Sequence, residues 1–172
     1  SITTSFIDSS INVITIHTAQ DVCKDGNADT LVDLFNIKNP SVFAKTVGKY
    51  GAGRCGTIDM VSPQELKELI ENKLNTKIIR TNEYFENMDE ISQIAILPGS
   101  GTQFMEEILD ITQVFITGDI SHRYLLKADE EKVGLIQIGH ISSEIPGMKK
   151  FVEKFNNFME LEINYLYKDF YE

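Results

Sequence analysis

Val133-Gly134-Leu135-Ile136-Gln137-Ile138 is followed directly by Gly139-His140-Ile141-Ser142-Ser143-Glu144. The first six residues form a short apolar run, which is typical of a buried strand. If a helix begins where this strand ends, His140 and Glu144 stand four residues apart on one helix face. An imidazole and a carboxylate that converge on one point suit a borderline divalent metal such as Zn, Mn or Fe. A helix-capping pair or a plain polar strand end would leave the same pattern.

The segments around this run alternate between strand-like and helix-like periodicity. We expect strands at 93–97, 113–117 and 133–138, helices at 102–110, 121–131 and 146–159, and a last edge strand at 161–167. Earlier in the chain we expect a strand at 11–16, a short helix at 29–35, a helix at 62–74, a short strand at 77–80 and a polar, turn-like segment at 81–92. Strands that alternate with helices predict an α/β layered fold, with a mixed, partly parallel sheet flanked by helices.

Polar residues follow several predicted strands at the point where each one ends. Pro98-Gly99-Ser100-Gly101 follows strand 93–97, and Thr117-Gly118-Asp119 closes strand 113–117. All three histidines of the chain, His17, His122 and His140, come just after predicted strands. Sheets of this class bind ligands at the carboxyl ends of their strands, so the pattern favours a metal site at that edge.

Three further features of this edge admit two interpretations each. Asp21 is either a metal ligand or a loop or helix-capping carboxylate. Asp119 either holds an imidazole in place or occupies a turn. The glycines at 99 and 101 either let backbone N–H groups face an anion or form a tight strand-to-helix turn.

The pattern G-x-G-x-x-G at 51–56 does not predict a dinucleotide site. That fingerprint needs a strong strand before it and a helix directly after it. Here residues 46–50 are weakly strand-like and residues 57–61 are typical of extended chain.

Composition excludes several classes of protein. The net charge of −10 argues against a nucleic-acid partner, which requires an excess of Lys and Arg. No apolar run reaches the ~18 residues of a membrane span, and residues 1–20 do not have the pattern of a signal peptide. Cys23 and Cys55 form no C-x-x-C motif, which favours a reducing compartment, the cytoplasm.

Five motifs occur in an order that resembles a known family, the GTP cyclohydrolase 1 type 2 homologs, also called the NIF-three-like family. They are His17-Thr18-x-x-Asp21, Gly51-x-Gly53-Arg54-x-Gly56, Pro98-Gly99-Ser100-Gly101, Thr117-Gly118-Asp119-x-x-His122 and Gly139-His140-x-Ser142-Ser143-Glu144. The resemblance runs from about Ile11 to the C-terminus.

The resemblance implies a site and an assembly. Family members are α/β proteins with a two-metal centre between two similar halves, and many form ring-shaped hexamers. It implies metal ligands at Asp21, His140 and Glu144, with His17 and His122 lining the same cleft as candidate catalytic groups.

The resemblance also implies that this chain corresponds to the C-terminal two-thirds of a member. Family members carry a preceding region with a His-His pair, and no His-His occurs here. We therefore expect residues 1–60 to be the end of an incomplete first half and 61–172 to be the second half. Because strand 11–16 would then lack its neighbours, we expect the chain to associate with copies of itself.

These observations favour a divalent-metal-dependent hydrolase that acts on a nucleotide or another phosphorylated small molecule. The alternatives are a non-catalytic metal-binding protein with a regulatory or protein-interaction role, and a folded remnant with an incomplete site.

Overall fold

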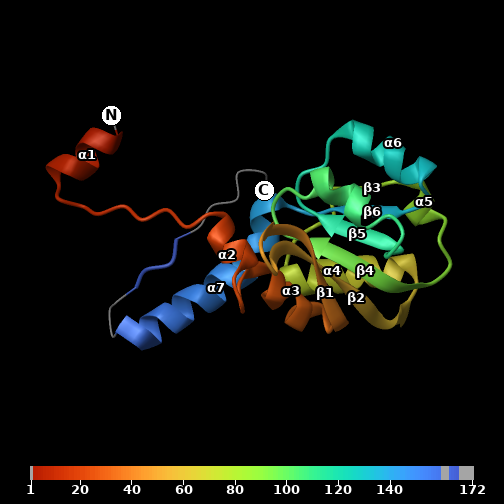
Figure 1. Ribbon diagram of the computed structural model, residues 1–172, viewed down its shortest axis with the longest axis horizontal. Helices are drawn as coiled ribbons and strands as arrows, with labels where there is room; N and C mark the ends of the chain where they lie inside the picture. Colours follow the sequence, from red (N-terminus) through yellow and green to blue (C-terminus); the bar gives the residue numbers. More distant parts are fainter. Residues whose placement is uncertain (1, 160–162, 167–172) are drawn as a thin grey trace.

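A six-stranded mixed sheet forms the centre of the molecule in the computed structural model, which describes residues 2–159 and 163–166 (Figure 1). The strands lie in the order β1-β2-β4-β5-β6-β3. Their bounds are Lys38–Val47 (β1), Tyr50–Val61 (β2), Arg80–Thr81 (β3), Ile91–Leu97 (β4), Val114–Thr117 (β5) and Gly134–Gln137 (β6). The central strands β4, β5 and β6 are parallel, whereas β1, β2 and β3 pair antiparallel with their neighbours. The predicted α/β fold with a mixed, partly parallel sheet is confirmed.

Helices cover both faces of this sheet (Figure 1). Their bounds are Ile2–Asp8 (α1), Thr18–Val22 (α2), Asn27–Phe35 (α3), Pro63–Leu74 (α4), Glu83–Glu86 (α5), Thr102–Glu107 (the 3-10 helix η1), His122–Glu130 (α6) and His140–Met159 (α7). Alternate residues of β4 point to opposite sides, so Ile94 and Ile96 pack in one core with α3 and α4. Ala95 and Leu97 pack in the other core, with η1 and α6.

Local sequence signals explain the best-predicted elements. Ser62 and Glu65 form the predicted capping box that opens α4, with Pro63 at the first helical position. Strands β5 and β6 are buried throughout, and β4 is buried over residues 94–97, as expected for parallel strands covered on both faces.

The structure corrects several element predictions. Residues 11–16 form no strand: they run as an extended arm from α1 to the body, with no described strand beside them to supply hydrogen bonds (Figure 1). As a result, His17 does not follow a strand. The segment 102–110 forms the six-residue η1 instead of an α-helix, and the polar segment 81–92 contains α5.

Three boundaries also differ from prediction. Helix α7 begins at His140 instead of residue 146, with Pro146 inside it. The strand expected at 77–80 is the two-residue β3. Of the predicted strand 161–167, residues 163–166 have no regular structure, and the rest lies outside the described residues.

The sequence did not predict the β1–β2 hairpin, apart from the extended chain that was expected at residues 57–61. Gly51–Gly56 lies inside β2, so the strand-turn-helix context of a dinucleotide site is absent there. Because β2 pairs with β4, one sheet runs across the division expected at residues 60/61, and that division stays a prediction. Within the described residues, no helix is long and apolar enough to cross a membrane.

Candidate metal centre

The loops that follow β4 and β5, together with the start of α7, meet at one edge of the sheet. They meet there because β4, β5 and β6 are parallel, which brings their carboxyl ends together. The backbone N–H of Asp119 donates to the carbonyl of Gly99 over 2.9 Å. The N–H of Gly99 donates to Ser143 Oγ over 2.8 Å, which ties the β4 loop to α7. The N–H of Ile138 donates to the carbonyl of Thr117 over 3.0 Å.

Two glycines permit this close approach. A Cβ on Gly118 would lie 2.0 Å from the carbonyl oxygen of Gly99 and 2.9 Å from Cα of His140. Gly99 has a φ of +73°, which L side chains rarely adopt. A Cβ there would lie 2.8 Å from Glu144 Oε1 and 3.3 Å from His140 Nε2. The space beside those two atoms is therefore open only because residue 99 has no side chain.

His140 and Glu144 form the pair that the sequence predicted. His140 opens α7, so its ring and the Glu144 carboxylate share one helix face, with Nε2 3.4 Å from Oε1. On the other side of the ring, Nδ1 lies 2.6 Å from Asp119 Oδ2. A carboxylate at Nδ1 favours a proton on that nitrogen and leaves the Nε2 lone pair directed at Glu144.

This geometry fits a divalent metal. Zinc binds His nitrogen at ~2.0–2.1 Å and carboxylate oxygen at ~2.0–2.2 Å in tetrahedral sites, which places two ligand atoms about 3.3 Å apart. The 3.4 Å between Nε2 and Oε1 matches that separation. The open space that a Cβ on residue 99 would fill lies next to the same two atoms.

The pKa values at this pair are shifted by burial and by neighbouring carboxylates. Burial lowers the pKa of His140, but the hydrogen bond with Asp119 and the charges of Glu144, Asp119 and Asp21 outweigh it and raise the pKa. Burial raises the pKa of the Glu144 carboxyl, and the charge of Asp21 adds to it against the attraction of His140. Excess negative charge at the pair is what a bound cation would neutralise.

Helix α2 supplies the opposite wall of the same pocket. The cavity measures about 390 Å³ and is lined by His17, Thr18, Asp21, Thr46, Ala52, Leu97, Pro98, Gly99, Ser100, Gln103, Phe104, His140 and Glu144. His17 caps α2 and is exposed, and Asp21 lies one turn further along. Asp21 Oδ1 accepts a hydrogen bond of 2.8 Å from Asn27 Nδ2, at the start of α3.

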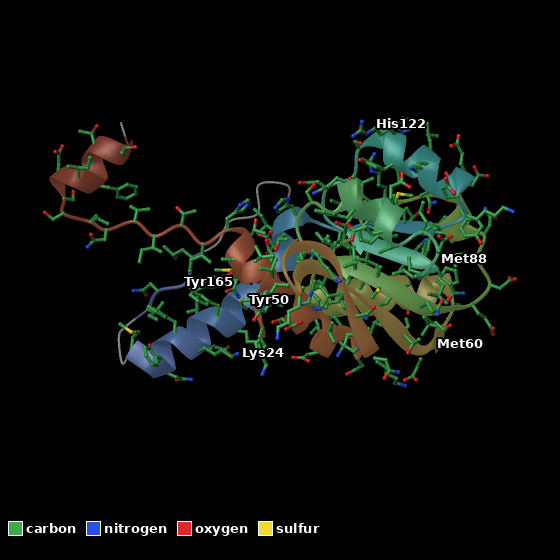
Figure 2. The ribbon with its side chains drawn as sticks, viewed as in Figure 1. Lys24, Tyr50, Met60, Met88, His122 and Tyr165 are labelled. Carbon is green, nitrogen blue, oxygen red and sulfur yellow. The ribbon has the colours of Figure 1, made fainter. Side chains whose placement is uncertain are left out.

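The structure thus brings four of the five predicted site residues to one pocket and leaves one apart. His122 is exposed at the first turn of α6, away from this pocket's lining (Figure 2). Within residues 2–159 and 163–166, no three His, Cys, Asp or Glu side chains are arranged close enough to hold an ion together. His140 and Glu144 are therefore the formed part of the site, and the roles of all five residues stay predictions.

Sequence reasoning missed the supporting roles of three residues, Asn27, Gly147 and Ser143. Asn27 is 3% exposed, its Nδ2 holds Asp21, and its Oδ1 has no partner among the described residues. Gly147 of α7 lies against it, and a Cβ there would fall 2.1 Å from Asn27 Oδ1. Ser143 ties α7 to the β4 loop. Gly147 indicated that α7 packs closely against another element there, but the sequence alone did not identify Asn27 as the residue it contacts.

Comparison with known proteins agrees with this architecture. A relative from Methanocaldococcus jannaschii, a GTP cyclohydrolase 1 type 2 homolog, is 29% identical over 161 residues, covering 91% of this chain and 62% of that protein. A homolog of the same name from Borreliella burgdorferi is 35% identical over 141 residues, covering 80% of this chain and 53% of that protein. The chain thus spans between half and two thirds of the length of these relatives.

Solved structures share the fold. Reduced HcgD from Methanocaldococcus jannaschii superposes with a TM-score of 0.77 at 26% identity, over 91% of this chain and 61% of that one. A Bacillus cereus protein related to NIF3 superposes with a TM-score of 0.81 at 14% identity, over 95% and 73%. The sequence model of Duf34/NIF3 (NGG1p interacting factor 3) matches residues 1–169. The chain belongs to the Duf34/NIF3 family.

Proposed function

We propose that this chain carries part of the metal site of a divalent-metal-dependent hydrolase that acts on a nucleotide or another phosphorylated small molecule. The observation that carries the proposal is the His140–Glu144 pair, set 3.4 Å apart beside the side-chain-free Gly99. The name of the relatives, GTP cyclohydrolase 1 type 2 homolog, supports a nucleotide substrate. The metal is Zn, Mn or Fe, since an imidazole and carboxylates suit these ions.

Some residues of the pocket bind the cation, and another orients one of its ligands. His140 Nε2 and Glu144 Oε1 bind the cation, and Asp21 contributes from the α2 wall. Asp119 keeps the proton of His140 on Nδ1, so that Nε2 stays available as a ligand. A divalent ion, when bound, supplies an activated water and positive charge for a developing oxyanion. Two ions per site, as the family resemblance implies, would require ligands beyond these three.

His17 and His122 are candidates for proton transfer. His17 lines the pocket as Asp21 does, and it is exposed, so a substrate that enters the pocket can reach it. His122 stands at the start of α6, outside the pocket lining, so a role in proton transfer requires the substrate to extend toward α6. We assign His17 the pocket role on this geometry and retain His122 as a contact with distal parts of the substrate.

Metal content tests the proposal directly. The wild-type chain, reconstituted with Zn or Mn and dialysed, should hold close to stoichiometric metal by elemental analysis. His140→Ala and Glu144→Ala should lose it, whereas His122→Ala, which also removes an imidazole but lies outside the pocket, should keep it. Equal metal in all four proteins would reject the site. Hydrolysis of GTP that depends on metal and is lost with His140 would establish the reaction class.

A second candidate function is a non-catalytic protein-interaction role. Apolar side chains on α1 and the arm are open to solvent, with Ile7 at 73% and Ile14 at 84% exposed. The family's name, NGG1p interacting factor 3, supports a partner protein. Bound metal without turnover of any nucleotide, combined with a stable complex in a pull-down, would favour this function over hydrolysis.

The proposed setting is the cytoplasm, and the proposed assembly is a homo-oligomer. Cys23 and Cys55 are both free thiols, which fits a reducing compartment. The exposed apolar arm favours association between copies of the chain.

A further inference from the structure

A second cavity lies between the end of α2 and the β1–β2 hairpin. None of the residues that line it also lines the proposed metal pocket. It measures about 340 Å³ and is lined by Val22, Lys24, Asp29, Pro40, Val42, Lys49, Tyr50 and Arg54. Figure 2 shows Lys24 and Tyr50 near one another, where the end of α2 meets the β1–β2 hairpin. The volume is within the ~300–1,000 Å³ range of small-molecule sites.

Positive charge gathers in this cavity although the chain carries a net charge of −10. Lys24, Lys49 and Arg54 line it, against a single carboxylate, Asp29. Both oxygens of that carboxylate are already occupied, because Oδ1 accepts from Arg54 Nε at 2.7 Å and Oδ2 accepts from the Asp25 N–H at 2.9 Å. The two lysines therefore have no acidic partner within the cavity lining.

Arg54 gives the cavity a fixed cationic base. Its side chain is only 8% exposed, and Nη1 donates to the carbonyls of Gly51 and Gly53 at 2.7 and 2.9 Å. With Nε on Asp29, these bonds hold the guanidinium rigidly. None of the described residues accepts a hydrogen bond from Nη2, and this nitrogen is not fully buried. Because Arg54 lines the cavity, Nη2 is open to it. A rigid guanidinium with a free N–H edge is well suited to bind a phosphate or carboxylate oxygen.

The remaining wall is aromatic and apolar. Tyr50 is 45% exposed, and Lys49 Nζ lies 5.6 Å from the centre of its ring. Val22, Pro40 and Val42 complete the lining. A half-exposed ring next to an ammonium group offers a planar ligand a surface to stack on and a charge to pair with.

We propose that this cavity binds a small anion that carries a planar ring, of the chemical class of a nucleoside monophosphate. Arg54 Nη2 and the ammonium groups of Lys24 and Lys49 bind the phosphate, and Tyr50 with the apolar wall contacts the ring. This site is separate from the proposed metal centre and does not depend on bound metal.

Calorimetric titration with GMP tests the proposal on the whole chain. Lys49→Glu and Tyr50→Ala change exposed side chains, so both variants should fold, and each should weaken GMP binding by about tenfold or more. Lys45→Glu is the matched control, because Lys45 is exposed on the same hairpin but outside the cavity lining, and it should bind as the wild type does. GMP binding to the wild-type chain should be the same with and without EDTA, which separates this site from the metal centre.

Two further ligands test separately whether the ring and the anion of GMP each contribute to binding. Guanosine retains the ring without the anion, and ribose 5-phosphate retains the anion without the ring. Each should bind at least about tenfold more weakly than GMP. The proposal is overturned if GMP does not bind at millimolar concentration, if Lys49→Glu binds like Lys45→Glu, if either fragment binds as well as GMP, or if EDTA abolishes GMP binding.

Discussion

The two walls of the proposed metal pocket are held in different ways. The strand-end wall consists of the loops 98–101 and 118–119 and the start of α7. Its parts are joined by hydrogen bonds from backbone N–H groups to backbone carbonyls and to the Ser143 hydroxyl. The α2 wall carries His17 and Asp21, follows an arm without regular structure, and has one side-chain hydrogen bond from Asn27. The strand-end wall is therefore a pre-formed half-site, whereas α2 is held by packing against β2 and α3, and the hydrogen bond from Asn27 holds Asp21.

The strand-end wall should be the less tolerant of substitution. Gly118→Ala places a methyl group 2.0 Å from the carbonyl of Gly99, and backbone on both sides cannot give way. We expect the free energy of unfolding to fall by about 3 kcal/mol, in the range of severe overpacking. Chemical denaturation monitored by circular dichroism measures it.

Gly48→Ala is the matched control for that substitution. Gly48 has a φ of +56° and no atom within 4 Å of the added methyl group, so only backbone strain of about 1 kcal/mol applies. Equal losses in the two variants would mean that the strand-end wall is not closely packed.

The strand-end wall was also the part that the sequence predicted best. Strands β5 and β6 and residues 94–97 of β4 are buried, so each appears as a short, mostly apolar segment followed by a Gly-containing polar cluster. Parallel pairing then brings the strand ends together without further information. The i, i+4 spacing of His140 and Glu144 fixed their convergence once α7 began at His140.

The α2 wall could not be predicted in the same way. The apolar residues at 11–16 have strand-like composition, but a strand requires a neighbour, and local sequence does not supply one. Strand β1 was missed because it is an edge strand with Pro40 and mostly exposed residues. The residues left Asp21 open between a metal ligand and a loop or capping carboxylate, and the family resemblance favoured the ligand. Its partner Asn27 was visible only in three dimensions.

Orientation of His140 should matter more than any single contact of the α2 wall. Asp119→Asn keeps the shape of the side chain but weakens its hold on Nδ1, so the affinity for Zn should fall about 10- to 100-fold. Competition with a chromophoric chelator measures the affinity. Asp110→Asn, which changes an exposed carboxylate outside the pocket lining, should leave the affinity unchanged. An unchanged affinity in Asp119→Asn would contradict the orienting role.

Loss of the Asn27 contact should weaken the α2 wall alone. Asn27→Ala frees Asp21, and we expect Zn affinity to fall by up to about tenfold, less than for Asp119→Asn. Asn72→Ala on the exposed face of α4 serves as the control. A loss larger than that of Asp119→Asn would reverse the order of the two walls.

The pH dependence of stability should report on the strand-end wall in the metal-free protein. The pKa of His140 is raised above 6.5 and that of Glu144 above 4.5, so proton binding favours the folded state at both groups. Their contributions are complete below these values and are lost as the pH rises through the raised pKa values. The free energy of unfolding should therefore decline with rising pH just above 6.5, and His140→Ala should flatten that decline. An unchanged slope in His140→Ala, or a steeper one, would contradict the assignment.

The arm before α2 should contribute least to the stability of the fold. Ile14 is 84% exposed, so Ile14→Ala should change the free energy of unfolding by no more than about 0.5 kcal/mol. The same truncation at Ile96, which is fully buried in β4, should cost about 2–5 kcal/mol. If the arm mediates association between copies, Ile14→Ala should also lower the mass measured by light scattering at micromolar concentration. Ile79→Ala, which truncates an apolar side chain that is 55% exposed on the body, should not. A monomeric mass for the wild type would exclude that association, and a large loss of stability in Ile14→Ala would show that the arm packs on the body.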